Sequence, residues 1–139
     1  MIAYHYETDF ELDKASDYTD WINRSVDTLG GQIGTLQYIF CSDEALLEIN
    51  KRYLSHDYYT DIITFQYEEG KVLSGDIYIS VDRVRENAVE FDQGFDQELR
   101  RVMIHGVLHL AGYRDKTDAE KSEMRVREND LMEMFHVKH

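Results

Sequence analysis

Two histidines near the end of an apolar segment are the residues of this sequence whose spacing best suits chemistry. His105 and His109 are four positions apart in the run His-Gly-Val-Leu-His-Leu-Ala-Gly-Tyr-Arg-Asp. On a helix this spacing places both side chains on the same side, with about 5–6 Å between their Cβ atoms. Two imidazole rings so placed can share one metal ion, because zinc binds histidine nitrogen at about 2.0–2.1 Å.

A third ligand follows the second histidine. Gly112 can adopt the left-handed conformation that ends a helix and reverses the chain, which lets Asp115 approach both histidines. Three protein ligands and one open position are typical of a catalytic zinc site. The sequence therefore predicts one zinc ion per chain, held by His105, His109 and Asp115. The alternative is a pair of histidines that are hydrogen-bonded inside a core helix and bind no metal.

The histidine spacing is also that of the zincin metalloproteases, but the general base of those enzymes is missing. In their motif His-Glu-x-x-His the glutamate after the first histidine acts as the base. Gly106 occupies that position here. A zincin-like protease is therefore the weaker alternative.

The elements that must position these residues are predicted from hydrophobic periodicity and capping signals. The histidine helix is expected over residues 96–111 and is nearly all apolar after Arg101, which is typical of a helix buried in the middle of a domain. Strands are expected over 1–7, 36–41, 62–67 and 72–81, and helices over 17–29, 42–54, 82–93 and 117–135. The predicted fold class is α+β, with a small mixed sheet of about four strands packed against about five helices around the buried central helix.

Length and composition indicate a single domain over residues 1–139. No run approaches the ~20 apolar residues of a membrane span, and the first residues do not resemble a signal peptide. The single cysteine, Cys41, excludes an intrachain disulfide. We therefore expect a cytoplasmic protein with no membrane association.

The charge balance limits the possible partners. The chain has 15 Lys and Arg residues against 28 Asp and Glu, a net charge of -13. This balance opposes indiscriminate binding to nucleic acid or to anionic lipid. RNA as a specific ligand would require the fold to assemble a local cationic surface.

The histidine run resembles the signature of a known family. The pattern His105-Gly-x-Leu-His109-Leu-x-Gly112-Tyr113 is similar to that of the YbeY family, the bacterial rRNA maturation endoribonucleases. The resemblance extends over about residues 36–130, through Asn50-x-x-Tyr53, Thr60-Asp61-Ile-Ile-Thr-Phe65 and Gly75-Asp76-Ile77. It implies a zinc-dependent hydrolase that cleaves single-stranded RNA, acting on the 3′ end of 16S rRNA and in ribosome assembly. It also implies partners among the proteins of the small ribosomal subunit and an Era-type GTPase.

Two positions depart from the family pattern. Asp115 stands where the family has a histidine as third ligand, and Leu54 stands where it has an arginine connected with RNase activity. A cation beside the scissile phosphate is still needed, and Arg114 is a candidate for it, with Arg52 and Lys116 as other possible substitutes. Asp76 is a candidate for the general base, for a partner of a ligand histidine, or for a contact with a ribosomal protein. Its plain alternative is an exposed strand carboxylate.

These departures leave a further alternative to the endoribonuclease. The chain would then be a non-catalytic ribosome assembly factor, in which the metal only fastens the loop after Gly112 and the protein acts by docking. Cleavage of RNA by the metal-loaded protein separates the two interpretations.

Overall fold

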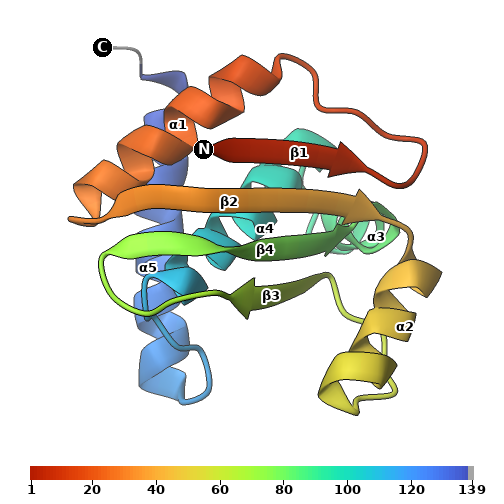
Figure 1. Ribbon diagram of the computed structural model, residues 1–139. Coiled ribbons are helices and arrows are strands. Elements are labelled where there is room, and N and C mark those ends of the chain that lie inside the picture. The colour runs from red at the N-terminus through yellow and green to blue at the C-terminus, as the bar shows by residue number, and fades with distance from the viewer. Residues whose placement is uncertain (138–139) are drawn as a thin grey trace.

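A four-stranded sheet, covered on one face by most of the helices, forms the framework of the protein (Figure 1). The computed structural model describes residues 1–137. Its elements are β1 (Ile2–Tyr6), α1 (Ala15–Thr28), β2 (Gln32–Cys41), α2 (Asp43–Leu54), β3 (Ile62–Gln66), β4 (Val72–Ser80), α3 (Val81–Glu90), α4 (Phe95–Leu110), α5 (Asp118–Glu133) and the short 3-10 helix η1 (Met134–His136). The predicted order of strands and helices and the α+β class are confirmed.

The sheet is mixed, as predicted. Its strands lie in the order β1-β2-β4-β3, with β1, β2 and β4 parallel and β3 antiparallel to β4. Side chains alternate between the two faces of each strand. In β4, Ile77 and Ile79 point into the main core, whereas Tyr78 on the other face packs with a smaller cluster beside α2.

The main core lies between the sheet and the helices behind it. Trp21 on α1 is fully buried, and its indole nitrogen donates to the carbonyl of Leu131 on α5 at 2.7 Å. Tyr38 on β2 donates its hydroxyl to the carbonyl of Met103 on α4 at 3.0 Å. These two bonds satisfy polar atoms that burial would otherwise leave unpaired. The first joins α1 to α5, and the second joins α4 to the sheet.

Helix α4 packs against β3 and β4 and also contacts α3 and α5. Its buried residues are Glu98, Leu99, Val102, Met103, Ile104, Gly106, Val107, Leu108 and Leu110. The expectation that this central helix is buried is not confirmed on all sides. The side chains of His105 and His109 are 21% and 30% exposed. No helix within residues 1–137 has both the length and the apolar character needed to cross a membrane.

Strand β2 begins at Gln32, earlier than the predicted Leu36, because the glycine-rich segment before Leu36 pairs with β4 through an irregular register. A Cβ on Gly34 would lie 2.1 Å from the Ser74 hydroxyl oxygen, so glycine is required at this close approach. Helix α3 also begins differently, with Ser80 as its N-cap accepting from the backbone N–H of Arg83 at 3.1 Å.

Candidate metal centre

Helix α4 presents its two histidines on one side. The ring centroids of His105 and His109 are 4.6 Å apart, and their Nε2 atoms face each other at 3.0 Å. This is the arrangement expected from residues one helical turn apart. It places two nitrogen donors at the partly exposed surface of an otherwise well-packed helix.

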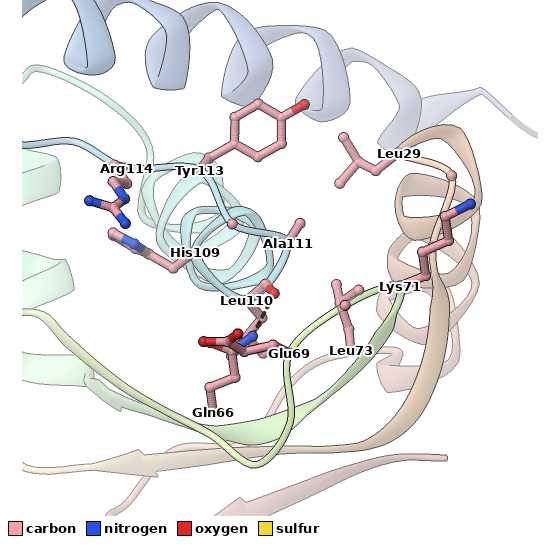
Figure 2. A pocket seen from close by; sticks show the side chains of 14 residues that line it. Leu29, Gln66, Glu69, Lys71, Leu73, His109, Leu110, Ala111, Tyr113 and Arg114 are labelled. Atoms are coloured by element: carbon pink, nitrogen blue, oxygen red, sulfur yellow. Dashed lines mark hydrogen bonds between the residues drawn. The ribbon is translucent and has the colours of Figure 1, made fainter.

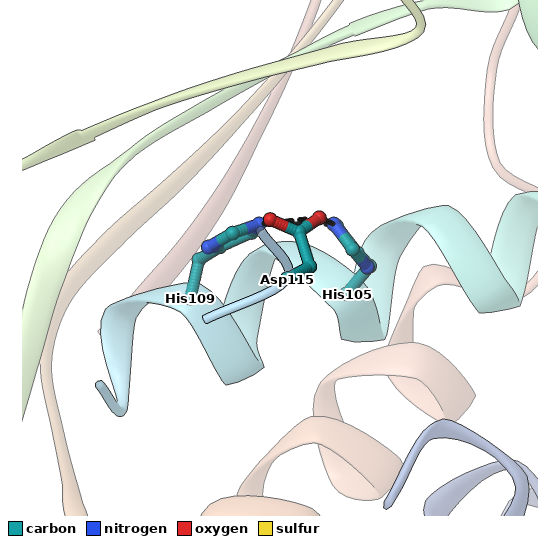
Figure 3. Close-up of side chains that lie close together, drawn as sticks. All are labelled: His105, His109 and Asp115. Atoms are coloured by element: carbon teal, nitrogen blue, oxygen red, sulfur yellow. Dashed lines mark hydrogen bonds and ion pairs between the residues drawn. The ribbon is translucent and has the colours of Figure 1, made fainter. Parts of the chain in front are cut away.

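The chain reversal after α4 brings Asp115 to the histidines. Gly112 has φ 99, and the backbone N–H groups of Gly112 and Tyr113 donate to the carbonyls of His109 and Leu108, both at 3.0 Å. These two bonds form the Schellman motif that closes a helix C-terminus. Asp115 Oδ2 then lies 3.3 Å from His105 Nε2 and 3.5 Å from His109 Nε2 (Figure 3).

The three donor atoms have the spacing of a zinc coordination shell. Each residue offers one ligand atom, and these atoms all lie within 4.8 Å of one another. Bonds of about 2.0–2.1 Å to a tetrahedral zinc ion place its ligands roughly 3.3 Å apart, and the observed separations are 3.0, 3.3 and 3.5 Å. Within residues 1–137 this is the only such group of three or more residues. The donor set therefore fits zinc with one position left open.

Glu128 on α5 contacts the back of His105. Its Oε2 lies 2.6 Å from His105 Nδ1, while Arg101 donates to its Oε1 at 2.9 Å. A ligand histidine whose second nitrogen meets a carboxylate is fixed in tautomer and orientation. Sequence reasoning missed Glu128. A signal existed, because Glu128 occupies a buried position between Met124 and Leu131 on the apolar stripe of α5.

The surroundings shift the pKa values of the two histidines in opposite directions. Burial opposes the charged form of His105, but the hydrogen bond and charge of Glu128, together with Asp115 and Asp61, outweigh burial and raise its pKa. Burial and the neighbouring His105 lower the pKa of His109. Burial likewise opposes the charge of Glu128, yet its hydrogen bonds with His105 and Arg101 hold its pKa below the usual range. Without metal, the pKa of His105 therefore lies above that of His109.

Cavities open on both sides of the cluster. The cavity on the His109 side has a volume of about 570 Å³, with Arg114 beside His109 at one end and Lys71 at the other (Figure 2). The cavity on the side of His105 and Asp115 has a volume of about 360 Å³ and is lined by α3, α4, α5 and the start of β3.

The structure places the other candidate residues as follows. Arg114 lies in the wall of the larger cavity. Asp76 accepts a hydrogen bond from Gln37 at 3.2 Å and faces the side of the sheet opposite to α4, because its neighbours Gly75 and Ile77 face that helix. The structure therefore does not bring Asp76 together with the histidines. Leu54 lies at the exposed end of α2.

Fold and site together define an α+β protein in which a helix-borne histidine pair and a following aspartate form one open donor cluster. The family model described as Endoribonuclease YbeY matches residues 4–136. The chain belongs to this endoribonuclease family, and the resemblance seen in its sequence is confirmed.

The sequence of this chain is similar to those of named relatives over nearly its whole length. The chain is 49% identical over 138 residues to an Endoribonuclease YbeY of Flavobacterium psychrophilum, and 47% identical over 137 residues to that of Flavobacterium johnsoniae. Each alignment covers 99% of this chain and 99% of the relative. The solution structure of TM1509 from Thermotoga maritima is similar with a TM-score of 0.70 and 30% identity, covering 97% of this chain and 89% of that one.

Proposed function

We propose that this chain is a metal-dependent endoribonuclease that cleaves single-stranded rRNA during maturation of the 16S 3′ end and ribosome assembly. The observation that carries the proposal is the meeting of three donor atoms at tetrahedral spacing in a chain of the endoribonuclease YbeY family. The cavities on both sides of these atoms supply room for an RNA strand to approach them.

The residues that hold the metal in this proposal are His105, His109 and Asp115, and the metal is zinc. When bound there, zinc would supply a Lewis acid for a phosphate oxygen or a water molecule. Three protein ligands would leave room for substrate or water beside them. Glu128 holds the ring of His105, so that its Nε2 points at the shared position.

Arg114 is the cation that this proposal assigns to the scissile phosphate. It lies beside His109 in the larger cavity (Figure 2), and a fixed positive charge there stabilises the negative charge that develops on the phosphate oxygens. Lys71 at the other end of the same cavity can contact a neighbouring phosphate. These cations give the acidic chain a local RNA-binding surface.

The biological setting belongs to the same proposal. The family resemblance supports a single domain over residues 1–139, acting in the cytoplasm with small-subunit proteins and an Era-type GTPase as partners. Asp76, on the sheet face away from α4, is available there for a contact with a ribosomal protein rather than for proton transfer at the cluster.

The protease alternative gains no support from the packing of Gly106. A Cβ at this position would lie 3.0 Å from side-chain atoms of Ile62 and Ile77, so a glutamate there would enter the core instead of the open site. The assembly-factor alternative keeps two observations in its favour, namely Leu54 and Asp115 in place of the family residues.

A cleavage assay tests the proposal. The metal-loaded protein is expected to cut a single-stranded RNA and to spare the same RNA in a duplex, and both a chelator and His109→Ala should abolish the cut. Failure of a correctly folded, metal-loaded sample to cut any RNA would favour the assembly factor. Cleavage of a peptide that His109→Ala abolishes would favour the protease.

A further inference from the structure

Strand β3 leaves one edge of the sheet open. It is the last strand in the order β1-β2-β4-β3, so within residues 1–137 only its inner edge pairs with another strand. Just past its end, the Tyr67 N–H donates to the Ser74 carbonyl of β4 at 2.9 Å. Because main-chain groups alternate in direction along an antiparallel strand, the odd-numbered residues of β3 are the ones bonded to β4. The N–H and C=O groups of Thr64 and Gln66 therefore point away from the sheet.

This open edge runs alongside the part of α4 that carries the histidines. Gln66 Nε2 donates to the carbonyl of Leu110, next to the second histidine, at 3.1 Å. At the other end of β3, Ile62 packs against Gly106, next to the first histidine, where a Cβ would lie 3.0 Å from the Ile62 side chain. Thr64 lies between these two contacts on the same face of the strand. The open edge is therefore a neighbour of the donor cluster.

Charge distinguishes the two ends of the edge. The 360 Å³ cavity at the start of β3 is lined by four carboxylates and by two arginines that both pair with Glu128. The carboxylates are those of Asp61, Glu98, Asp115 and Glu128. The 570 Å³ cavity at the end of β3 has two cations, Arg114 and Lys71, against one carboxylate, Glu69, among its described lining residues (Figure 2). In a chain with a net charge of -13, an anionic ligand therefore fits the end of β3 and not its start.

We propose that the main-chain N–H and C=O groups of Thr64 and Gln66 pair with the Watson–Crick edges of unpaired RNA bases beside the cluster. The inference rests on the proposed endoribonuclease function. The N–H and C=O of one residue in an extended strand point the same way and offer a donor beside an acceptor. The Watson–Crick edge of each RNA base also has a donor beside an acceptor. The open edge of β3 therefore accepts any base that is not already paired, which favours single strands over a duplex.

An extended peptide is the other ligand that pairs with an open sheet edge. RNA is favoured here for two reasons. The edge lies beside the donor cluster of a chain that belongs to an endoribonuclease family. The cavity at the end of β3 also has an excess of positive charge, which suits the phosphates of RNA.

Binding of oligouridine and of oligo(N3-methyluridine) to the full chain tests the proposal, with chelator present so that no metal-dependent cleavage occurs. The methyl group blocks the Watson–Crick edge and leaves the phosphate charges unchanged. The wild type should bind oligouridine about tenfold more tightly than the methylated strand. Thr64→Pro removes one outward-facing donor, a change that edge strands tolerate, and should remove most of this preference. Thr64→Val keeps the N–H group and should retain it.

A second pair of variants covers the case in which Thr64→Pro does not fold, as urea denaturation would show. Gln66→Pro should reduce the preference for oligouridine, whereas Gln66→Ala, which keeps the N–H group, should not. The comparison in the wild type needs no variant at all.

Equal binding of the two oligomers by the wild type, or an unchanged preference in a folded proline variant, would overturn the proposal. So would a lysine-rich extended peptide that shifts the NMR amide signals of Thr64 and Gln66 when oligouridine does not, because the edge would then bind a polypeptide. Binding requires no hydrolysis, so a failed RNA cleavage assay would contradict the proposed function separately.

Discussion

Glu128 Oε2 lies 2.6 Å from His105 Nδ1, and this contact joins α5 to the histidine pair on α4. Arg101 holds the other carboxylate oxygen at 2.9 Å. Because Nδ1 is occupied in this way, Nε2 is the nitrogen that His105 turns towards His109 and Asp115. Helix α5 therefore sets the orientation of His105, a candidate ligand on α4.

Glu128→Gln should weaken metal binding. The amide keeps the size of the side chain but loses the charge that orients and polarises His105, and loss of such a carboxylate costs about 10–100-fold in metal affinity. Competition with a chelating indicator measures the change, with Glu133→Gln as the control on the same helix. Wild-type affinity in Glu128→Gln would show that the carboxylate does not orient the ligand.

Metal affinity should increase with pH. The pKa of His105 is raised above its ordinary value of 6.5, so near neutral pH a proton still competes with the metal for this histidine. We expect the apparent affinity to rise from about pH 6 to about pH 8. In Glu128→Gln the pKa of His105 should be lower, because the carboxylate that raises it is gone. The increase in metal affinity should therefore occur at a lower pH than in the wild type. A flat profile in the wild type would contradict the account.

Removing the metal should lower the melting temperature. A ligand that binds only the folded chain stabilises it by mass action, so a chelator should shift the melting curve of the wild type downward. Asp115→Ala should shrink this shift, while Asp115→His, which restores a neutral third ligand, should preserve it. Identical curves with and without chelator in all three proteins would count against the site.

Gly75→Ala should destabilise the sheet beside α4. A Cβ on Gly75 would lie 2.4 Å from the carbonyl oxygen of Phe65 on β3 and 3.1 Å from Leu110 on α4. Forcing these groups apart costs about 1–3 kcal/mol of the free energy of unfolding, which urea denaturation measures. Gly94→Ser is the control, because a Cβ at Gly94 meets nothing within 4 Å. Equal stability of Gly75→Ala and the wild type would show that β3 and β4 can separate without cost.

Arg114→Gln should slow RNA cleavage without removing the metal. Loss of one group that stabilises transition-state charge costs about 100-fold in kcat, whereas the three ligands are untouched. Arg85→Gln, an exposed change on α3, serves as the control for lost positive charge. An unchanged kcat would remove Arg114 from the mechanism, and an equal loss of bound metal would indicate a structural role.

The sequence predicts the ligand cluster because its parts are local. The spacing of His105 and His109, and the glycine that turns Asp115 back, depend on one helix and its end. Glu128 escaped prediction because its position depends on how α5 packs against α4. The sequence also does not predict on which face of the sheet Asp76 lies. Alternation along a strand separates two faces but does not show which of them packs against the histidine helix.

Elemental analysis of the purified protein measures whether His105, His109 and Asp115 hold a metal. We expect about one zinc ion per chain in the wild type and a large loss in His105→Ala, His109→Ala and Asp115→Ala, with Asp76→Ala retaining the metal; this is the zinc-site hypothesis. A folded wild type that binds no metal when zinc is supplied, or a zinc content that survives replacement of both histidines, would contradict it.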